Sequence, residues 1–107
     1  MNNNTYLPLG SIVYIKGDLQ KLMIISRGMV IANGNEQVLF DYGACMYPYG
    51  MINDKVAYFN HEDIAQVVHE GYSDSDDQAV LRTIQEALKK QNFNKGTAEM
   101  FKHGGPL

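Results

Sequence analysis

The chain has 107 residues, of which 45% are hydrophobic and 20% charged, and its formal net charge is −3. This length predicts one domain that can bury its own core. The single cysteine excludes an internal disulfide and a cysteine-based zinc site, and the scattered basic residues before position 73 offer no positive face for nucleic acid.

The sequence also carries no pattern of export or membrane insertion. Its first residues, Met1 to Thr5, lack the basic and apolar regions of a signal peptide. The apolar runs are a few residues long, far below the roughly 20 residues that span a bilayer. A cytoplasmic location without membrane contact is therefore expected.

Residues 1–72 have the pattern of a small β domain, with short apolar runs separated by glycine and asparagine. Strands are predicted at residues 11–16, 21–27, 37–42, 56–59 and 66–72. The second of these is apolar on both faces and should lie inside the sheet, and residues 29–32 either continue it or begin another strand. Gly28 predicts a bulge or bend, and Asn33-Gly34 predicts a type I′ hairpin turn.

Two irregular segments interrupt the predicted strands. Residues 43–54 are expected to form a long loop that is rich in tyrosine and methionine. A helical turn is expected near residues 60–65, with Asn60 as its N-cap and acidic side chains close to its positive end.

The pattern changes at the acidic run of residues 73–77. From Gln78 to Gln91 the apolar residues recur at helical spacing, which predicts one amphipathic helix. Ser75 and Gln78 fit a capping box at its start. Residues 92–107 lose the pattern and are expected to form a flexible tail.

These elements predict an α+β fold, in which a small, strongly bent antiparallel sheet or an SH3-like β-barrel is followed by one C-terminal amphipathic helix. The expected division is a β domain at residues 1–72, an acidic cap and helix at residues 73–91, and a tail at residues 92–107.

The most suggestive catalytic residues are His61, Glu62 and Asp63, because imidazole and carboxylate groups bind metals and transfer protons. Three consecutive residues on one helical turn point in different directions, however, so we interpret them as a capped turn. His69 lies in a predicted strand and is expected to be structural. No catalytic residue is predicted, although an uncharacterised enzyme remains a remote alternative.

Neither the thiol nor the acidic run predicts a cofactor or metal site. Cys45 has no neighbouring base or cation that would lower its pKa. Asp74, Asp76 and Asp77 lack the glycine and the terminal glutamate of a calcium-binding loop, so helix capping and solvation explain them.

Two groups of residues suggest contact with a protein partner, because tyrosine and methionine provide large contact areas and an amphipathic helix can fill a groove. The loop group is Tyr42, Met46, Tyr47, Tyr49 and Met51, and the helix group is Val80, Leu81, Ile84 and Leu88. For each group the alternative is packing against the domain's own core.

Six sequence blocks within residues 6–72 resemble one known family. They are LPLGSIVY (7–14), KLMIISRG (21–28), FDY (40–42), MYPYG (46–50), YFNHEDI (58–64) and VVHEGY (67–72). The resemblance is to a small domain of unknown function from Gram-positive bacteria, encoded in type VII secretion loci beside toxins that carry an LXG domain.

This resemblance implies a non-enzymatic accessory factor that binds an LXG toxin as its chaperone or targeting partner. The alternative that it implies is an immunity protein, which would neutralise the cognate toxin. The family supplies no activity, cofactor or catalytic residue that could be transferred to this chain.

Overall fold

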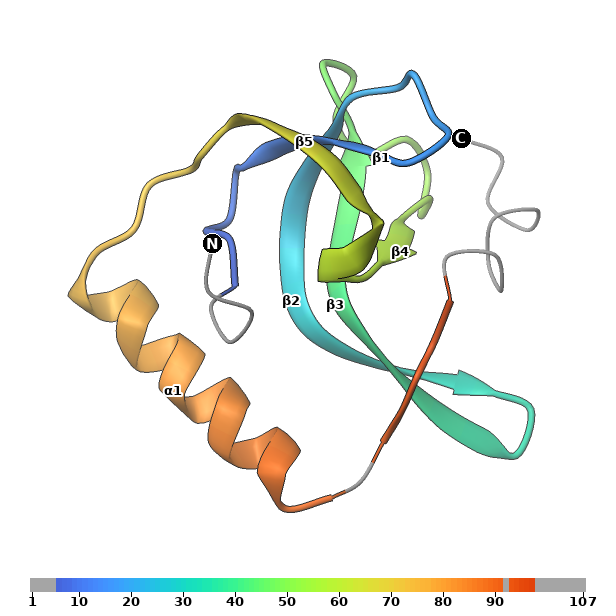
Figure 1. The fold of residues 1–107 in the computed structure, drawn as a ribbon, viewed down its shortest axis with the longest axis vertical. Helices are drawn as coiled ribbons and strands as arrows, with labels where there is room; N and C mark the ends of the chain where they lie inside the picture. The colour runs from blue at the N-terminus through green and yellow to red at the C-terminus, as the bar shows by residue number, and fades with distance from the viewer. Residues whose placement is uncertain (1–5, 92, 98–107) are drawn as a thin grey trace.

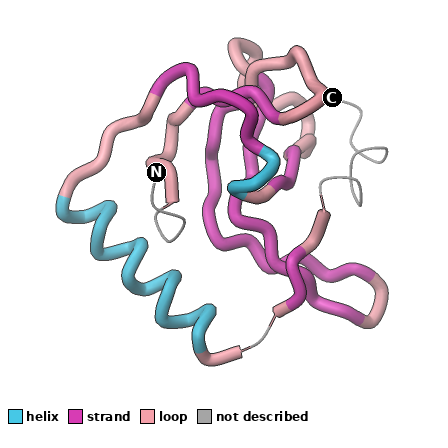
Figure 2. The backbone as a smooth tube through the Cα atoms, in the orientation of Figure 1, coloured by secondary structure: helices cyan, strands magenta, loops and turns pink. Residues whose placement is uncertain are grey.

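The computed structural model describes residues 6–91 and 93–97. It is an α+β fold, in which a strongly bent, mainly antiparallel sheet lies beside one helix (Figure 1, Figure 2). The predicted fold class is therefore confirmed. The elements are β1 (Ile12–Ile15), β2 (Leu22–Asn33), β3 (Glu36–Met46), β4 (Ala57–Phe59), the 3₁₀ turn η1 (His61–Asp63), β5 (Ile64–His69), α1 (Ser75–Lys89) and β6 (Asn94–Lys95).

The strand order in the sheet is β4-β3-β2-β1-β5, and β6 pairs with β3 beside this path. β2 is the central strand, as its apolar character on both faces predicts. Among the described residues, β4 and β5 are the two ends of the path and have no pairing with each other. Of the two predicted alternatives, a bent sheet and an SH3-like barrel, the structure therefore has the bent sheet.

The β2–β3 hairpin is longer than the sequence predicts. β2 continues through residues 29–32, and its register shift falls between Ile24 and Ser26 instead of at Gly28. Asn33 pairs with Glu36, so the two-residue turn lies one position later than expected. These two strands curve through the middle of the molecule and project beyond the rest of the sheet at the lower right of Figure 1.

The predicted loop at residues 43–54 is wrong in its first part. β3 continues to Met46, because residues 42–44 pair with β2 on one side and with β4 on the other. Such a doubly paired strand is buried on its edges and faces, which makes alternation of polar and apolar residues unnecessary. The loop itself therefore begins only at Tyr47.

The apolar face of α1 packs on its own domain. Leu81 belongs to the core, Ile84 packs against that core, and Val80 points outward and is exposed. The core residues are Tyr6, Leu7, Val13, Leu22, Ile24, Tyr42, Ala44, Phe59 and Leu81. The helix and the β domain thus form one structural unit.

α1 lies in close contact with the sheet at Gly28 in β2. Gly28 has a φ of +63°, and a Cβ at this position would lie 2.6 Å from Cγ2 of Ile84. Both the backbone conformation and the contact therefore require glycine. The glycine that the sequence marks as a bend is thus the place where the helix sits on the sheet.

The start of α1 differs by one residue from the predicted capping box. Asp74 is the N-cap, and its Oδ1 accepts a hydrogen bond of 3.1 Å from the backbone N–H of Asp77. Ser75 is instead the first residue of the helix, which ends at Lys89, two residues earlier than predicted. Asp77 also forms an ion pair of 2.6 Å with Arg27, which joins the first turn of the helix to β2.

Two residues of the predicted tail belong to the sheet. Asn94 and Lys95 form β6, which pairs in parallel with Val38 and Leu39 of β3. Residues 98–107 lie outside the described residues. No helix in the described part of the chain is long and apolar enough to cross a membrane.

Candidate functional site

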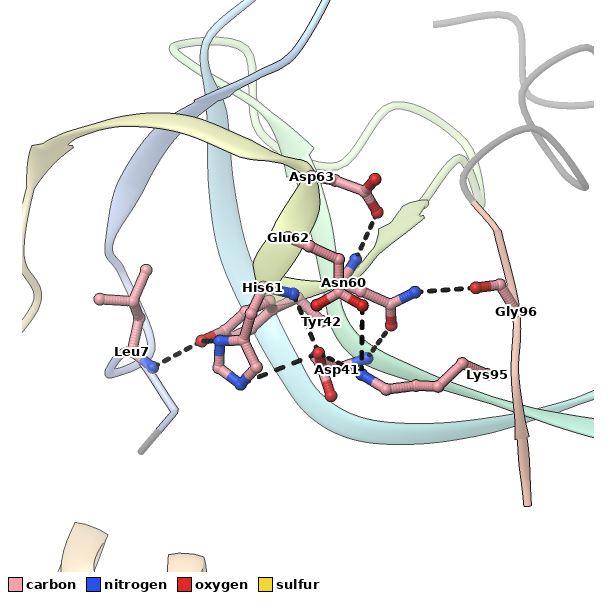
Figure 3. A network of polar contacts seen from close by, with 9 residues as sticks. All are labelled: Leu7, Asp41, Tyr42, Asn60, His61, Glu62, Asp63, Lys95 and Gly96. Carbon is pink, nitrogen blue, oxygen red and sulfur yellow. Dashed lines mark hydrogen bonds and ion pairs between the residues drawn. The ribbon is translucent and has the colours of Figure 1, made fainter. Parts of the chain in front are cut away.

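A network of polar contacts gathers around Asp41, a buried carboxylate in β3 (Figure 3). Its Oδ2 accepts hydrogen bonds from the backbone N–H of His61 at 2.9 Å and from Nζ of Lys95 at 2.6 Å. The side chain of Asn60 lies beside it, accepting from the N–H of Asp41 at 2.9 Å and donating to the carbonyl of Gly96 at 2.8 Å. One carboxylate and one amide thus connect β3, η1 and β6.

Asn60 occupies the N-cap position of η1, as predicted. Its side chain also turns toward β3, where it contacts Asp41. Asp63 supplies a capping contact, because its Oδ2 accepts from the backbone N–H of Asn60 at 2.8 Å.

The hydroxyl group of Tyr42 extends this network toward the N-terminal segment. It accepts a hydrogen bond of 2.8 Å from the backbone N–H of Leu7 and lies 3.0 Å from Nδ1 of His61. Donation from the hydroxyl to Nδ1 satisfies both groups, which places the imidazole proton on Nε2. That nitrogen lies 3.8 Å from Oδ2 of Asp41.

Burial sets the protonation of these rings. Burial raises the pKa of Tyr42 above its usual range. Burial also raises the pKa of Tyr6 to about 12, with a smaller contribution from the charge of Asp41. It also lowers the pKa of His61 below the ordinary value of 6.5; the charge of Asp41 opposes this effect, and that of Lys95 adds to it. The two phenols are therefore protonated and the imidazole is neutral at neutral pH.

The lowered pKa of His61 predicts that mild acid destabilises the fold. The unfolded chain binds the proton more readily than the folded chain, so stability is greatest above pH 6.5 and falls as the pH drops below that value. We expect the urea midpoint to fall between about pH 8 and about pH 5 in the native chain and to fall less in His61→Gln. His69→Gln is the matched control, because His69 is exposed on β5, and it should keep the native pH profile.

The other candidate acid–base residues do not converge on His61. Glu62 is exposed, Asp63 caps η1, and His69 lies at the far end of β5, opposite Ile12. Among the described residues, no three His, Cys, Asp or Glu side chains form a group that could hold a metal ion. The arrangement joins segments of the chain, because its buried polar groups satisfy one another.

The residues predicted to contact a partner fall into two classes. Tyr42 and Leu81 are buried in the core, and Met46 and Ile84 pack against it. Leu88 is half-buried, and its Cδ1 would lie 3.8 Å from a Cβ at Gly28. These five side chains therefore contribute to packing within the domain, and Tyr42 and Leu81 are fully enclosed by it.

Tyr47, Tyr49, Met51 and Val80 are the predicted contact residues that lie on the surface, with 41%, 68%, 52% and 49% of their areas exposed. The first three share the loop between β3 and β4, whereas Val80 lies on α1. In Figure 1 this loop is at the top and α1 is at the lower left. The two groups therefore do not form one surface.

A neighbouring loop adds a residue that sequence analysis missed. The side-chain amide of Gln20 donates a hydrogen bond of 2.8 Å to the carbonyl of Tyr47, and the N–H of Tyr47 donates one of 3.0 Å to the carbonyl of Lys21. Leu19, directly before Gln20, is 94% exposed. We call Leu19, Tyr47, Tyr49 and Met51 the loop patch. The sequence signal that could have identified Leu19 is that it is a single leucine within the otherwise polar turn after β1.

The comparisons with known proteins give one match. Residues 6–80 match the model of a protein family described as a domain of unknown function (DUF4176). No curated protein and no solved structure matches the chain significantly.

Proposed function

The chain belongs to the DUF4176 family, whose domain has no described function, and we propose that it is a non-enzymatic accessory factor that binds another protein. In this proposal it acts in the cytoplasm of a Gram-positive bacterium as the chaperone or targeting partner of an LXG toxin exported by type VII secretion. The likeness of its six sequence blocks to a family encoded beside such toxins supports this choice of partner.

The loop patch is the observation that carries the proposal. It exposes two tyrosines, a methionine and a leucine that the core does not use. Tyrosine is favoured at interfaces because its ring buries a large area and its hydroxyl can still form hydrogen bonds. The hydrogen bonds of Gln20 and Lys21 to Tyr47 fix the backbone of this patch before a partner binds, which reduces the entropy lost on association.

The polar network supports a binding role over a catalytic one. The hydroxyl of Tyr42, the imidazole of His61 and the carboxylate of Asp41 each engage other groups of the chain. A general base or nucleophile must instead present its reactive atom to a substrate. These side chains hold β3, η1, β6 and the N-terminal segment together.

Co-expression with the LXG protein encoded beside this chain tests the proposal. We expect one complex on size-exclusion chromatography at micromolar concentration. Tyr49→Ser combined with Leu19→Ser should weaken that complex at least about tenfold without changing the unfolding midpoint, because truncation of a central aromatic contact typically costs about 1 kcal/mol or more. Tyr72→Ser is the matched control, since Tyr72 is 81% exposed in the segment between β5 and α1.

Separate elution of the two native proteins would contradict the proposal. A loop-patch variant that binds as tightly as the native chain would place the interface outside the loop patch. Capture of toxin fragments distinguishes the two possible roles: a chaperone or targeting factor binds the N-terminal LXG region, whereas an immunity protein binds the toxic C-terminal domain and protects a cell that expresses it.

A further inference from the structure

The outer edge of β3 is covered by three different parts of the chain in turn. β4 pairs with residues 42–44, the amide of Asn60 binds the N–H of Asp41, and β6 pairs with Val38 and Leu39. In Figure 3 the segment that carries Lys95 and Gly96 runs beside β3, and both residues meet the network there. The last part of this edge, from Val38 to Asp41, is therefore a strand-pairing site that an extended segment fills, and we call it the groove.

The groove contacts its occupant through the backbone, through one charge and through an exposed hydrogen bond of 3.1 Å from Nδ2 of Asn94 to Oε1 of Glu36. The N–H of Gly96 donates a hydrogen bond of 2.8 Å to the carbonyl of Leu39, and the carbonyl of Gly96 accepts one of 2.8 Å from Asn60. Nζ of Lys95 lies 2.6 Å from Oδ2 of Asp41 and 3.9 Å from Oε1 of Glu62. These contacts require an extended backbone with a cationic side chain. They do not constrain the residues that precede or follow the bound segment.

The position after the cation accepts only glycine. Gly96 is buried against the ring of Phe40, and a Cβ on Gly96 would lie 2.9 Å from Cε1 of that ring and closer still to Cζ and Cε2. Phe40 is itself fully buried and cannot move aside without disturbing the core. The groove therefore selects a basic residue followed directly by glycine.

We infer that this groove is an exchangeable peptide site. An extended segment of a partner protein, with lysine or arginine followed by glycine, binds along Val38 and Leu39 in place of the chain's own Asn94–Gly96. The inference rests on the proposed protein-binding function and assigns to it a second contact surface, separate from the loop patch. The chain's own segment is the structural template for the occupant.

Exchange is favoured by the shortness of the native segment. β6 has two residues, and the exposed part of Lys95 leaves its ion pair with Asp41 open to water and salt. Because the segment is tethered, its effective concentration at the groove is of millimolar order. A partner segment must therefore either bind more tightly than the chain's own segment or be held close by another contact, which the loop patch would supply.

The test uses the full chain and a synthetic peptide of residues 91–97. Gly96→Val should eject the chain's own segment, because the added side chain cannot fit against Phe40. The peptide should then bind this variant with a dissociation constant below about 1 mM and shift the NMR signals of Leu39, Asp41 and Asn60. Binding to the native chain should be at least tenfold weaker, since its groove is already filled.

A second variant, Lys95→Glu, opens the groove by charge repulsion and keeps the test valid if valine at position 96 disturbs folding. The matched controls are Thr97→Val, at the exposed neighbour of Gly96, and Lys90→Glu, with the same charge change at the helix end. Both should behave like the native chain. Peptides in which the lysine is alanine or the glycine is valine should bind at least tenfold more weakly.

Absence of saturable shifts at Leu39, Asp41 and Asn60 in both opened variants would overturn the inference, as would equal binding of the altered peptides. The assay contains no toxin, so its failure leaves the complex proposed above unaffected. Conversely, if the peptide binds but the chain forms no complex with the toxin, the inferred peptide site stands and the proposed toxin partner is rejected.

Discussion

Replacing Gly28 with alanine is expected to lower the free energy of unfolding by about 2 to 4 kcal/mol. Two costs add at this position. The φ of +63° lies in the left-handed region, where a side chain costs roughly 1–2 kcal/mol. The new methyl group would also lie 2.6 Å from Cγ2 of Ile84, so either α1 must move or the side chain must leave its rotamer. Urea unfolding followed by circular dichroism measures the loss.

Gly34→Ala is the matched control for this prediction. Gly34 has a φ of +66°, but a Cβ added there would meet no heavy atom within 4 Å beyond its chain neighbours, so it reports the backbone cost alone. The contact with the helix accounts for the remainder. In an Ile84→Ala background the cost of Gly28→Ala should therefore fall to about that of Gly34→Ala. Equal costs for the two glycines in the native background would contradict the packing of α1 on β2.

The second large effect is expected at the ion pair between Arg27 and Asp77. Only 4% of the Arg27 side chain and 13% of the Asp77 side chain are exposed, and their closest atoms lie 2.6 Å apart. Asp77→Ala leaves the guanidinium buried, and its remaining hydrogen bond within the described residues is a long one of 3.5 Å to the carbonyl of Leu7. We expect a loss of about 3 kcal/mol, since a buried charge without its partner is costly.

Asp76→Ala provides the control for the helix dipole. Asp76 lies beside Asp77 in the first turn of α1 but is exposed, so its loss should cost about 0.5 kcal/mol. The double variant Arg27→Met with Asp77→Leu should recover most of the stability, because two apolar side chains can replace a buried pair. A loss in Asp77→Ala no larger than that in Asp76→Ala would contradict this account.

The ion pair between Arg27 and Asp77 stabilises the fold by an amount that depends on pH in the acid range. The hydrogen bond from Arg27 is the main cause that lowers the pKa of Asp77 below its ordinary value of 3.8. The stabilisation is therefore present above pH 3.8 and is lost as the pH falls through the lowered pKa. This range lies below the one in which His61 acts, so the two effects are separable in a single titration.

Local patterns in the sequence were sufficient to predict most elements of the fold. Alternating and continuous apolar runs located β1, β2, β4 and the start of β3, and helical spacing located α1. They failed at residues 43–46, because Gly43 and Ala44 have no strand signal of their own and are held in β3 by neighbours on both sides. Strand pairing overrides propensity in such a central segment.

The candidate sites were less accessible to sequence reasoning. Tyr42 looks like the first residue of an aromatic loop, and its burial follows only from the extension of β3. Asp41 and Lys95 are 54 positions apart and belong to no motif, so their ion pair depends on the path of the whole chain. The contact role of the exposed part of the loop, Tyr47 to Met51, stays a prediction that rests on its composition, which suits an interface.

The pairing of Ile12 with His69 also has a consequence for synthesis. β2 and β3 are joined by a tight turn and can pair as soon as both have left the ribosome. β1 gains its second neighbour only after β5 has emerged, and Leu81 covers the remaining core later still. The nascent polypeptide therefore exposes Val13 and Leu22 through most of its elongation, and that interval is when it is most vulnerable to aggregation.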